Sequence, residues 1–126
     1  LAGRLALTIV EFLGHVSDVE QIWADNHALV LPSRYEGTPL ALVEAMFCAR
    51  PCIVTDVAGN PELVEHGITG FVACGASIHL LDRALEEAWQ RRDEWQRIGV
   101  TARERIASLV PPDPVRQFCE HLIRVR

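Results

Sequence analysis

The sequence predicts an α/β fold with a short parallel sheet. Two short apolar runs, residues 28–31 and 52–55, each lead into a segment with a helical pattern. Strands that alternate with helices favour a parallel sheet with helices packed on its faces. Because the chain has 126 residues, of which 49% are hydrophobic, and contains no low-complexity tract, it should be globular with a real core.

The region before the first of these runs is expected to contain a strand and a short helix. Residues 1–7 should be the end of a helix, and the β-branched and aromatic run 8–13 should form a strand. Ser17 or Asp18 can cap a helix that runs to about residue 25.

The central stretch reads as strand, turn and helix. The first apolar run stops at Pro32, which cannot donate a hydrogen bond to a sheet. Residues 40–49 are apolar or small except for Glu44, and this segment is predicted to be a helix. Thr38 is the expected N-cap of this helix, and Pro39 fits its first position, where a missing N–H costs nothing.

A further helix and strand should follow the second apolar run. Asn60 can cap this helix and Pro61 can open it, and Gly67 should stop it after residue 66. Residues 71–73 then form a last short strand.

The C-terminal part is expected to be helical. Ser77 caps a long helix, and a second helix follows it. The proline-rich residues 111–114 break the chain before a final amphipathic helix at 115–123. Trp89 and Trp95 lie at helical spacing from apolar positions, which predicts packing in the core rather than stacking on a sugar.

The turn before the helix at 40–49 is suited to bind a diphosphate. Free amides at the start of a helix, together with its dipole, favour an anion. Glu36 lies in the turn, and Glu44 lies beyond Pro39 by roughly 7–8 Å along the helix axis, on the same side as Leu40. Carboxylates accept hydrogen bonds from sugar hydroxyls. One carboxylate at each end of a diphosphate suits a nucleoside diphosphate sugar.

The stretch from Glu36 to Met46 resembles the Glu-x7-Glu signature of retaining GT-B glycosyltransferases, and of family 4 (glycosyl transferases group 1) in particular. The resemblance begins at residues 10–14 and continues through 51–56, 59–62 and 67–71, so it covers about residues 8–75. Ordered blocks at the family's spacing are far more specific than a single Glu-x7-Glu motif.

The resemblance implies a partial Rossmann-like three-layer domain, the later part of the family's C-terminal donor-binding domain without its first two strands. Residues 1–126 would form one incomplete domain, with a core at about 8–75 and C-terminal helices at about 77–126. In a sheet of order 3-2-1-4-5-6, the strand at 8–13 would lack its neighbours. It would then pair with 28–31, swap with another copy or remain loose. Ala49 stands where the family usually has glycine, and would be strained if that position needs a positive φ.

The resemblance also implies a function, the binding of a nucleotide-diphosphate-sugar for transfer of a hexose, with retention, to a glycan, lipid or small-molecule acceptor. A missing N-terminal domain would hold the acceptor, so we expect this chain alone to be inactive. Neither a cofactor nor a metal is expected, because cations and the helix end neutralise the diphosphate. Two alternatives remain, a non-catalytic split or truncated subunit and a nucleotide-binding module like a GT-B sugar-nucleotide epimerase.

The family's residue roles carry over as follows. Glu36 binds sugar hydroxyls, the amides of residues 37–40 bind the distal phosphate and the sugar, and Glu44 binds the ribose. His15 and Val16 lie beside the nucleobase. No residue is assigned a catalytic role. The main donor-binding candidates are Glu36, Gly37, Thr38, Pro39, Leu40 and Glu44, and the secondary ones are His15, Val16, Ser33, Arg34, Gly59 and Glu62.

Several of these residues also fit other roles. His15 fits an exposed loop equally well. Arg34 can reach a phosphate, pair with Glu36 or lie on the surface. Glu44 stands alone among apolar neighbours, so it must face a cavity or form an ion pair, for which Arg34 and Arg50 are the candidates.

Composition excludes other classes of function. The net charge of −5, from 12 basic and 17 acidic residues, argues against a nucleic-acid partner. No apolar run approaches the ~20 residues of a membrane span, and no signal peptide is visible. The four cysteines are expected to be buried, reduced thiols of a cytoplasmic protein, which in full-length form could be peripheral at the inner membrane. Self-association is expected through the unpaired strand or the final helix.

Overall fold

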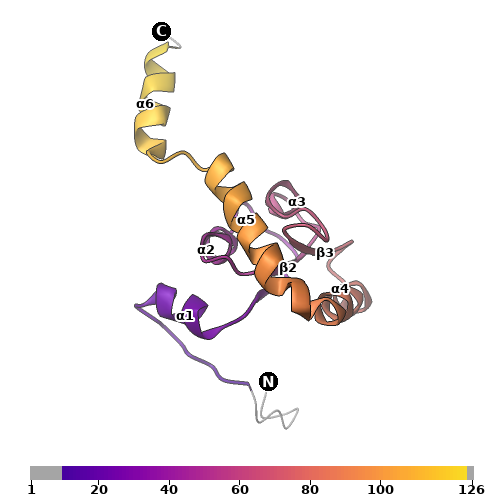
Figure 1. The fold of residues 1–126 in the computed structure, drawn as a ribbon. Coiled ribbons are helices and arrows are strands. Elements are labelled where there is room, and N and C mark those ends of the chain that lie inside the picture. Colours follow the sequence, from indigo (N-terminus) through magenta and orange to yellow (C-terminus); the bar gives the residue numbers. More distant parts are fainter. Residues whose placement is uncertain (1–9, 125–126) are drawn as a thin grey trace.

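The computed structural model describes residues 10–124 and shows an α/β fold around a three-stranded sheet (Figure 1). The strand order is β1-β2-β3, and both pairs of neighbours run parallel, which confirms the predicted fold class. In chain order the elements are α1 (Val19–Asp25), β1 (Leu29–Leu31), α2 (Leu40–Phe47), β2 (Cys52–Thr55), α3 (Asn60–Leu63), β3 (Gly70–Ala73), α4 (Ile78–Gln90), the 3-10 turn η2 (Arg92–Glu94), α5 (Trp95–Leu109) and α6 (Pro114–Arg124).

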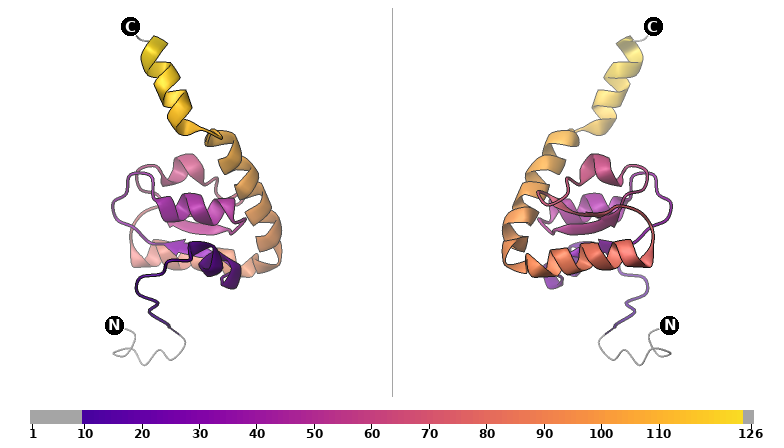
Figure 2. Two further views of the ribbon diagram at one scale, coloured as in Figure 1. Left: turned by 90° about the vertical axis from the view of Figure 1, so that its left-hand side faces the viewer. Right: turned by 90° about the vertical axis from the view of Figure 1, so that its right-hand side faces the viewer.

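Helices cover both faces of the sheet, which gives three layers (Figure 2). Side chains alternate across the central strand β2, and all of its residues are buried. Cys52 and Val54 pack with apolar residues of α2 and α5, whereas Ile53 packs with Ala84 and Ala88 of α4. Two hydrophobic clusters, one on each face, therefore fix the strands and the loops that follow them.

The carboxyl ends of the three strands meet at one edge of the sheet. Leu31 of β1 lies opposite Val54, and Thr55 at the end of β2 lies opposite Ala73 of β3. The loops after β1 and β2 therefore open at the edge where parallel α/β sheets bind ligands.

The predicted strand at residues 8–13 is wrong for the part that the structure describes. Residues 10–13 form no strand, and Phe12 and Leu13 are 74% and 53% exposed. β-branched and aromatic residues need a neighbouring strand and a half-buried surface to form a strand, and in the described chain β1 pairs only with β2. Residues 8 and 9, like the helix end predicted at 1–7, lie outside the described residues.

Helices α2 and α3 differ from their predictions at their ends. Pro39 has a ψ of 123° and precedes α2, so it is not the first helical residue, and Thr38 is not the N-cap. Helix α3 ends at Leu63 rather than at residue 66. It stops early because the amide of Glu65 donates to Oγ1 of Thr69 at 2.8 Å, which closes a separate turn.

The end of α2 confirms the strain expected at Ala49. This residue has a φ of 55°, in the left-handed region. The amide of Ala49 donates to Met46 O at 3.0 Å, and the amide of Arg50 donates to Ala45 O at 2.9 Å. Such bonds close the C-terminus of a helix around a residue that is usually glycine.

The other helices and their caps are confirmed. Asp18 accepts a hydrogen bond from the amide of Gln21 at 3.0 Å at the start of α1. Ser77 accepts one from the amide of Leu80 at 3.3 Å at the start of α4. Each cap satisfies an amide that the first turn of a helix leaves free.

The prediction that Trp89 packs in the core is wrong. Trp89 is 58% exposed, and its ring lies edge-on to Trp95, with centroids 6.3 Å apart. The guanidinium of Arg92 lies 5.0 Å from the Trp89 centroid. Trp95 is half-buried, and its Nε1 donates to Ala88 O at 2.8 Å. This pair therefore joins α4 to α5 at the surface.

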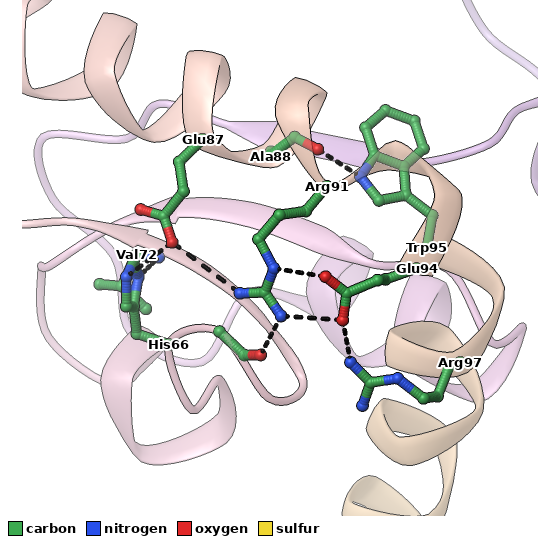
Figure 3. Close-up of polar contacts among 9 residues, drawn as sticks. His66, Val72, Glu87, Ala88, Arg91, Glu94, Trp95 and Arg97 are labelled. Atoms are coloured by element: carbon green, nitrogen blue, oxygen red, sulfur yellow. Dashed lines mark hydrogen bonds and ion pairs between the residues drawn. The ribbon is translucent and has the colours of Figure 1, made fainter.

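A polar network holds the edge strand β3 against the helices (Figure 3). Arg91 donates through Nη2 to Gly67 O at 3.0 Å and through Nε to Glu94 at 2.8 Å. His66 Nδ1 accepts a hydrogen bond from the amide of Val72 at 3.0 Å. This contact satisfies an N–H on an edge strand, where an unpaired N–H invites another chain.

The burial predicted for the four cysteines is only partly correct. Cys52 is buried, and burial raises the pKa of its thiol to about 12, so it is inert at neutral pH. Cys48 is half-buried, but Cys74 and Cys119 are exposed. These two residues lie after β3 and on α6, where no described element covers them.

Candidate functional site

The turn after β1 places Glu36 beside the end of β2. Ser33 Oγ donates to Glu36 Oε1 at 2.6 Å, and Thr55 Oγ1 donates to the backbone oxygen of Ser33 at 2.5 Å. Arg34 is exposed, and within residues 10–124 it forms no ion pair with Glu36. The Glu36 carboxylate is therefore held by its own turn rather than by a cation.

The loop between β2 and α3 touches this turn at Gly59. A Cβ atom at Gly59 would lie 2.9 Å from Gly37 O and 3.4 Å from Thr38 Oγ1. Only a residue without a side chain allows this approach without displacing the Gly37 carbonyl. The structure thus brings Gly59 together with the turn that carries Glu36.

The start of α2 offers free amides. Pro39 O accepts hydrogen bonds from the amides of Leu42 and Val43 at 3.1 and 3.3 Å, and no side chain caps the helix. Among the residues that the structure describes, the amides of Leu40 and Ala41 have no acceptor. Together with the dipole of an eight-residue helix, these amides favour an anion.

Glu44 lies on the exposed face of α2. It is one turn after Leu40, which is 75% exposed, whereas Leu42, Ala45 and Met46 on the other face are fully buried. Within the described chain Glu44 forms no ion pair, so the structural pair considered with Arg34 or Arg50 is not formed. An exposed carboxylate carries no desolvation cost and remains available to a ligand.

Three of the secondary candidates have no described contact with the Glu36 turn. His15 is exposed and Val16 is half-buried in the segment before α1, and no hydrogen bond or ion pair in the described chain joins them to the Glu36 turn. Glu62 is exposed in the first turn of α3. Arg105 of α5 donates to Glu62 O at 2.8 Å and to Leu63 O at 2.7 Å, so α5 fixes α3 in place.

Two residues near the site were missed as site residues by the sequence reasoning. Thr55 is the one hydroxyl residue of β2 and stands at its carboxyl end. A polar residue at that position is the signal in the sequence that could have identified it as a site residue. Asn60 was expected to cap α3, but it is fully buried and its Nδ2 donates to Thr55 O at 3.1 Å. Gly59 occupies the N-cap position instead, without a side-chain hydrogen bond.

Neither a metal cluster nor a membrane helix is found between residues 10 and 124. No three His, Cys, Asp or Glu side chains in this range gather closely enough to hold a metal ion. No helix in the same range combines the length and the apolar character needed to cross a bilayer.

The strand-turn-helix arrangement at the carboxyl end of a parallel sheet defines a ligand-binding type of α/β domain, and comparison with known proteins gives the family. Residues 2–91 match the family model described as "Glycosyl transferases group 1", so the chain belongs to this family. N-acetyl-alpha-D-glucosaminyl L-malate synthase of Bacillus anthracis is 35% identical over 98 residues, which cover 77% of this chain and 26% of that protein. The UDP-Gal:alpha-D-GlcNAc-diphosphoundecaprenol alpha-1,3-galactosyltransferase of Escherichia coli is 42% identical over 60 residues, covering 48% of this chain and 16% of that protein.

Solved structures show the same fold, that of GT-B glycosyltransferases. Sucrose-phosphate synthase from Thermosynechococcus elongatus superposes with a TM-score of 0.84 at 25% identity, covering 98% of this chain and 32% of that one. HepE from Anabaena in complex with UDP-glucose gives a TM-score of 0.86 at 24% identity, covering 99% of this chain and 35% of that one. The chain thus spans about a quarter to a third of the length of three of these proteins. It covers a smaller part of the galactosyltransferase.

Proposed function

We propose that this chain is the donor-binding part of a retaining glycosyltransferase that uses a nucleotide-diphosphate-sugar to transfer a hexose. The observation that supports this most directly is the arrangement at α2, where free amides lie between two carboxylates. Family membership and the nucleotide named in relatives' titles support the same ligand class. The acceptor, a glycan, lipid or small molecule, would be bound outside this chain.

Each part of the site has a role in the proposal. The amides of Leu40 and Ala41 bind the distal phosphate, and the helix dipole adds to its stabilisation. Glu36 accepts hydrogen bonds from hexose hydroxyls, and Glu44 accepts them from the ribose. Ser33 and Gly59 support the turn. No residue of the chain is assigned to bond breaking, so we expect donor binding without transfer.

The proposal includes no metal. The helix end, with cations supplied from outside this chain, would neutralise the leaving diphosphate. We further propose that the protein acts in the cytoplasm, where nucleotide sugars are used.

Saturation-transfer NMR with UDP-glucose, GDP-mannose and ADP-glucose tests the proposal. We expect transfer to ribose and hexose protons from one of the three, and loss of that signal in Glu44→Ala and Glu36→Ala. Glu104→Ala is the matched control, since Glu104 is an exposed glutamate of α5 without an ion pair in the described chain. Equal signals from all the variants, or none from folded wild-type protein with any donor, would contradict the proposal.

A second candidate is a non-catalytic subunit that completes a site with another polypeptide. The apolar face of α6 favours it, because Val115, Phe118, Leu122 and Ile123 are 54–73% exposed. In Figure 1, α6 extends away from the layers of the domain. When no other polypeptide is present, we propose that this face mediates self-association of the chain, because contiguous exposed apolar side chains promote association.

A further inference from the structure

We propose that Thr55 is a positioning residue of the donor site, which fixes the Glu36 turn and the loop before α3 to the end of the central strand. The consequence for ligand binding rests on the function proposed above. The positional claim itself rests only on contacts within the chain.

Thr55 makes one hydrogen bond to the Glu36 turn and one to Asn60, the residue of α3 that directly follows the other loop. It is the last residue of β2 and is 1% exposed. Its Oγ1 donates to Ser33 O at 2.5 Å, and its backbone oxygen accepts from Asn60 Nδ2 at 3.1 Å. Since β2 is the central strand and all of its residues are buried, it holds these loops at a fixed place in the sheet.

Both bonds lead directly to donor-site candidates. Ser33 connects Thr55 to Glu36, because its Oγ donates a hydrogen bond to Glu36 Oε1 at 2.6 Å. Asn60 is fully buried and directly follows Gly59, whose backbone lies against Gly37. The two loops therefore meet through Thr55 and again where Gly59 touches Gly37, so a shift at Thr55 would move both.

The arrangement requires a hydroxyl at this position. Valine has the same shape but cannot donate, so it would leave Ser33 O without its buried partner. Serine keeps the donor and loses only a methyl group. Thr69 provides a matched control. Thr69 is 2% exposed, and its Oγ1 accepts a hydrogen bond from the amide of Glu65 at 2.8 Å. It precedes β3 at the amino end of that strand, whereas Thr55 lies at the carboxyl end of β2.

The test compares Thr55→Val, Thr55→Ser and Thr69→Val by two measurements on the 126-residue chain. The first is the amide ¹H–¹⁵N spectrum of residues 36–38, 40 and 41 without ligand, and the second is UDP-glucose affinity by NMR titration. We expect Thr55→Val to shift these amides and to weaken binding roughly tenfold, the effect of losing about one hydrogen bond's worth of positioning. Thr55→Ser should resemble the wild type, and Thr69→Val should lower the melting temperature without either change.

Unshifted amides in folded Thr55→Val, or equal shifts in Thr69→Val, would overturn the proposal. If Thr55→Val does not fold, Thr55→Ala removes the hydroxyl without placing a methyl group against Ser33 O, and the same outcomes apply. If the wild type binds no UDP-glucose, the failure belongs to the proposed function with this donor. The ligand-free spectra then still decide whether Thr55 positions the turn.

Discussion

Two alanines hold backbone conformations that glycine would adopt freely. Ala49 follows Cys48, the C-cap of α2, with a φ of 55°, and Ala58 lies in the loop before α3 with a φ of 44°. A left-handed conformation costs an L-residue roughly 1–2 kcal/mol. Ala49 lies beyond the C-terminal end of α2, where its backbone oxygen is in close contact with Gly99 of α5.

We predict that Ala49→Gly stabilises the chain. Relief of the left-handed strain outweighs the larger entropy of glycine in the unfolded state, so the free energy of unfolding should rise by about 0.5–1 kcal/mol in urea titrations. Ala107→Gly, at an exposed position within α5, should instead lower it by about 1 kcal/mol. Equal losses in both variants would show that Ala49 is not strained.

Among the elements, Arg91 at the C-cap of α4 links η2, through Glu94, to the turn before β3, through Gly67 O (Figure 3). Hydrogen bonds from Arg91, and next from Arg97, lower the pKa of Glu94 from its ordinary 4.5 to about 2. Because the folded-state pKa is the lower one, this carboxylate stabilises the fold above about pH 4.5, and the contribution is lost as the pH falls towards 2.

We therefore predict that Glu94→Gln lessens the acid sensitivity of the fold. Urea unfolding of the wild type should show a loss of stability as the pH falls below 4.5 that is smaller in this variant. Glu104→Gln, on the same helical segment but without an ion pair in the described chain, should keep the wild-type slope. An unchanged slope in Glu94→Gln would mean that the pair contributes nothing, as many surface pairs do.

The elements that sequence predicts correctly are those with local signals. Asp18 and Ser77 each cap a helix by accepting a hydrogen bond from an amide three residues further along the chain. The apolar run of β2 is buried wherever the strand lies in the sheet. The strand predicted at 8–13 fails in its described part because a strand depends on a neighbour. Helix α3 is shortened by Thr69, which no helix signal near Pro61 reveals.

The site, too, has parts that local sequence signals predict and parts that depend on residues far apart in the chain. The Glu36 turn and the start of α2 are contiguous in sequence, so strand, turn and helix signals locate them together. The contact of Thr55 with Ser33 spans 22 positions, and that of Arg105 with Leu63 spans 42, so neither is visible in a local pattern. The exposure of Trp89 likewise depends on how α4 packs against α5, which helical periodicity alone does not give.

For the whole molecule, we predict that the chain self-associates through α6. Sedimentation velocity should show a concentration-dependent dimer, and Phe118→Asp should return it to monomer. Gln117→Asp, on the polar face of the same helix, is the matched control and should leave the dimer intact. A monomer at every concentration in the wild type would contradict this prediction.

A crystal structure of this chain with the donor that binds, beginning with UDP-glucose, would test the donor site most directly. We predict the distal phosphate within hydrogen-bonding distance of the Leu40 and Ala41 amides, with the ribose at Glu44 and the hexose at Glu36. A donor bound elsewhere on the chain, or bound here with its ribose away from Glu44, would contradict this prediction.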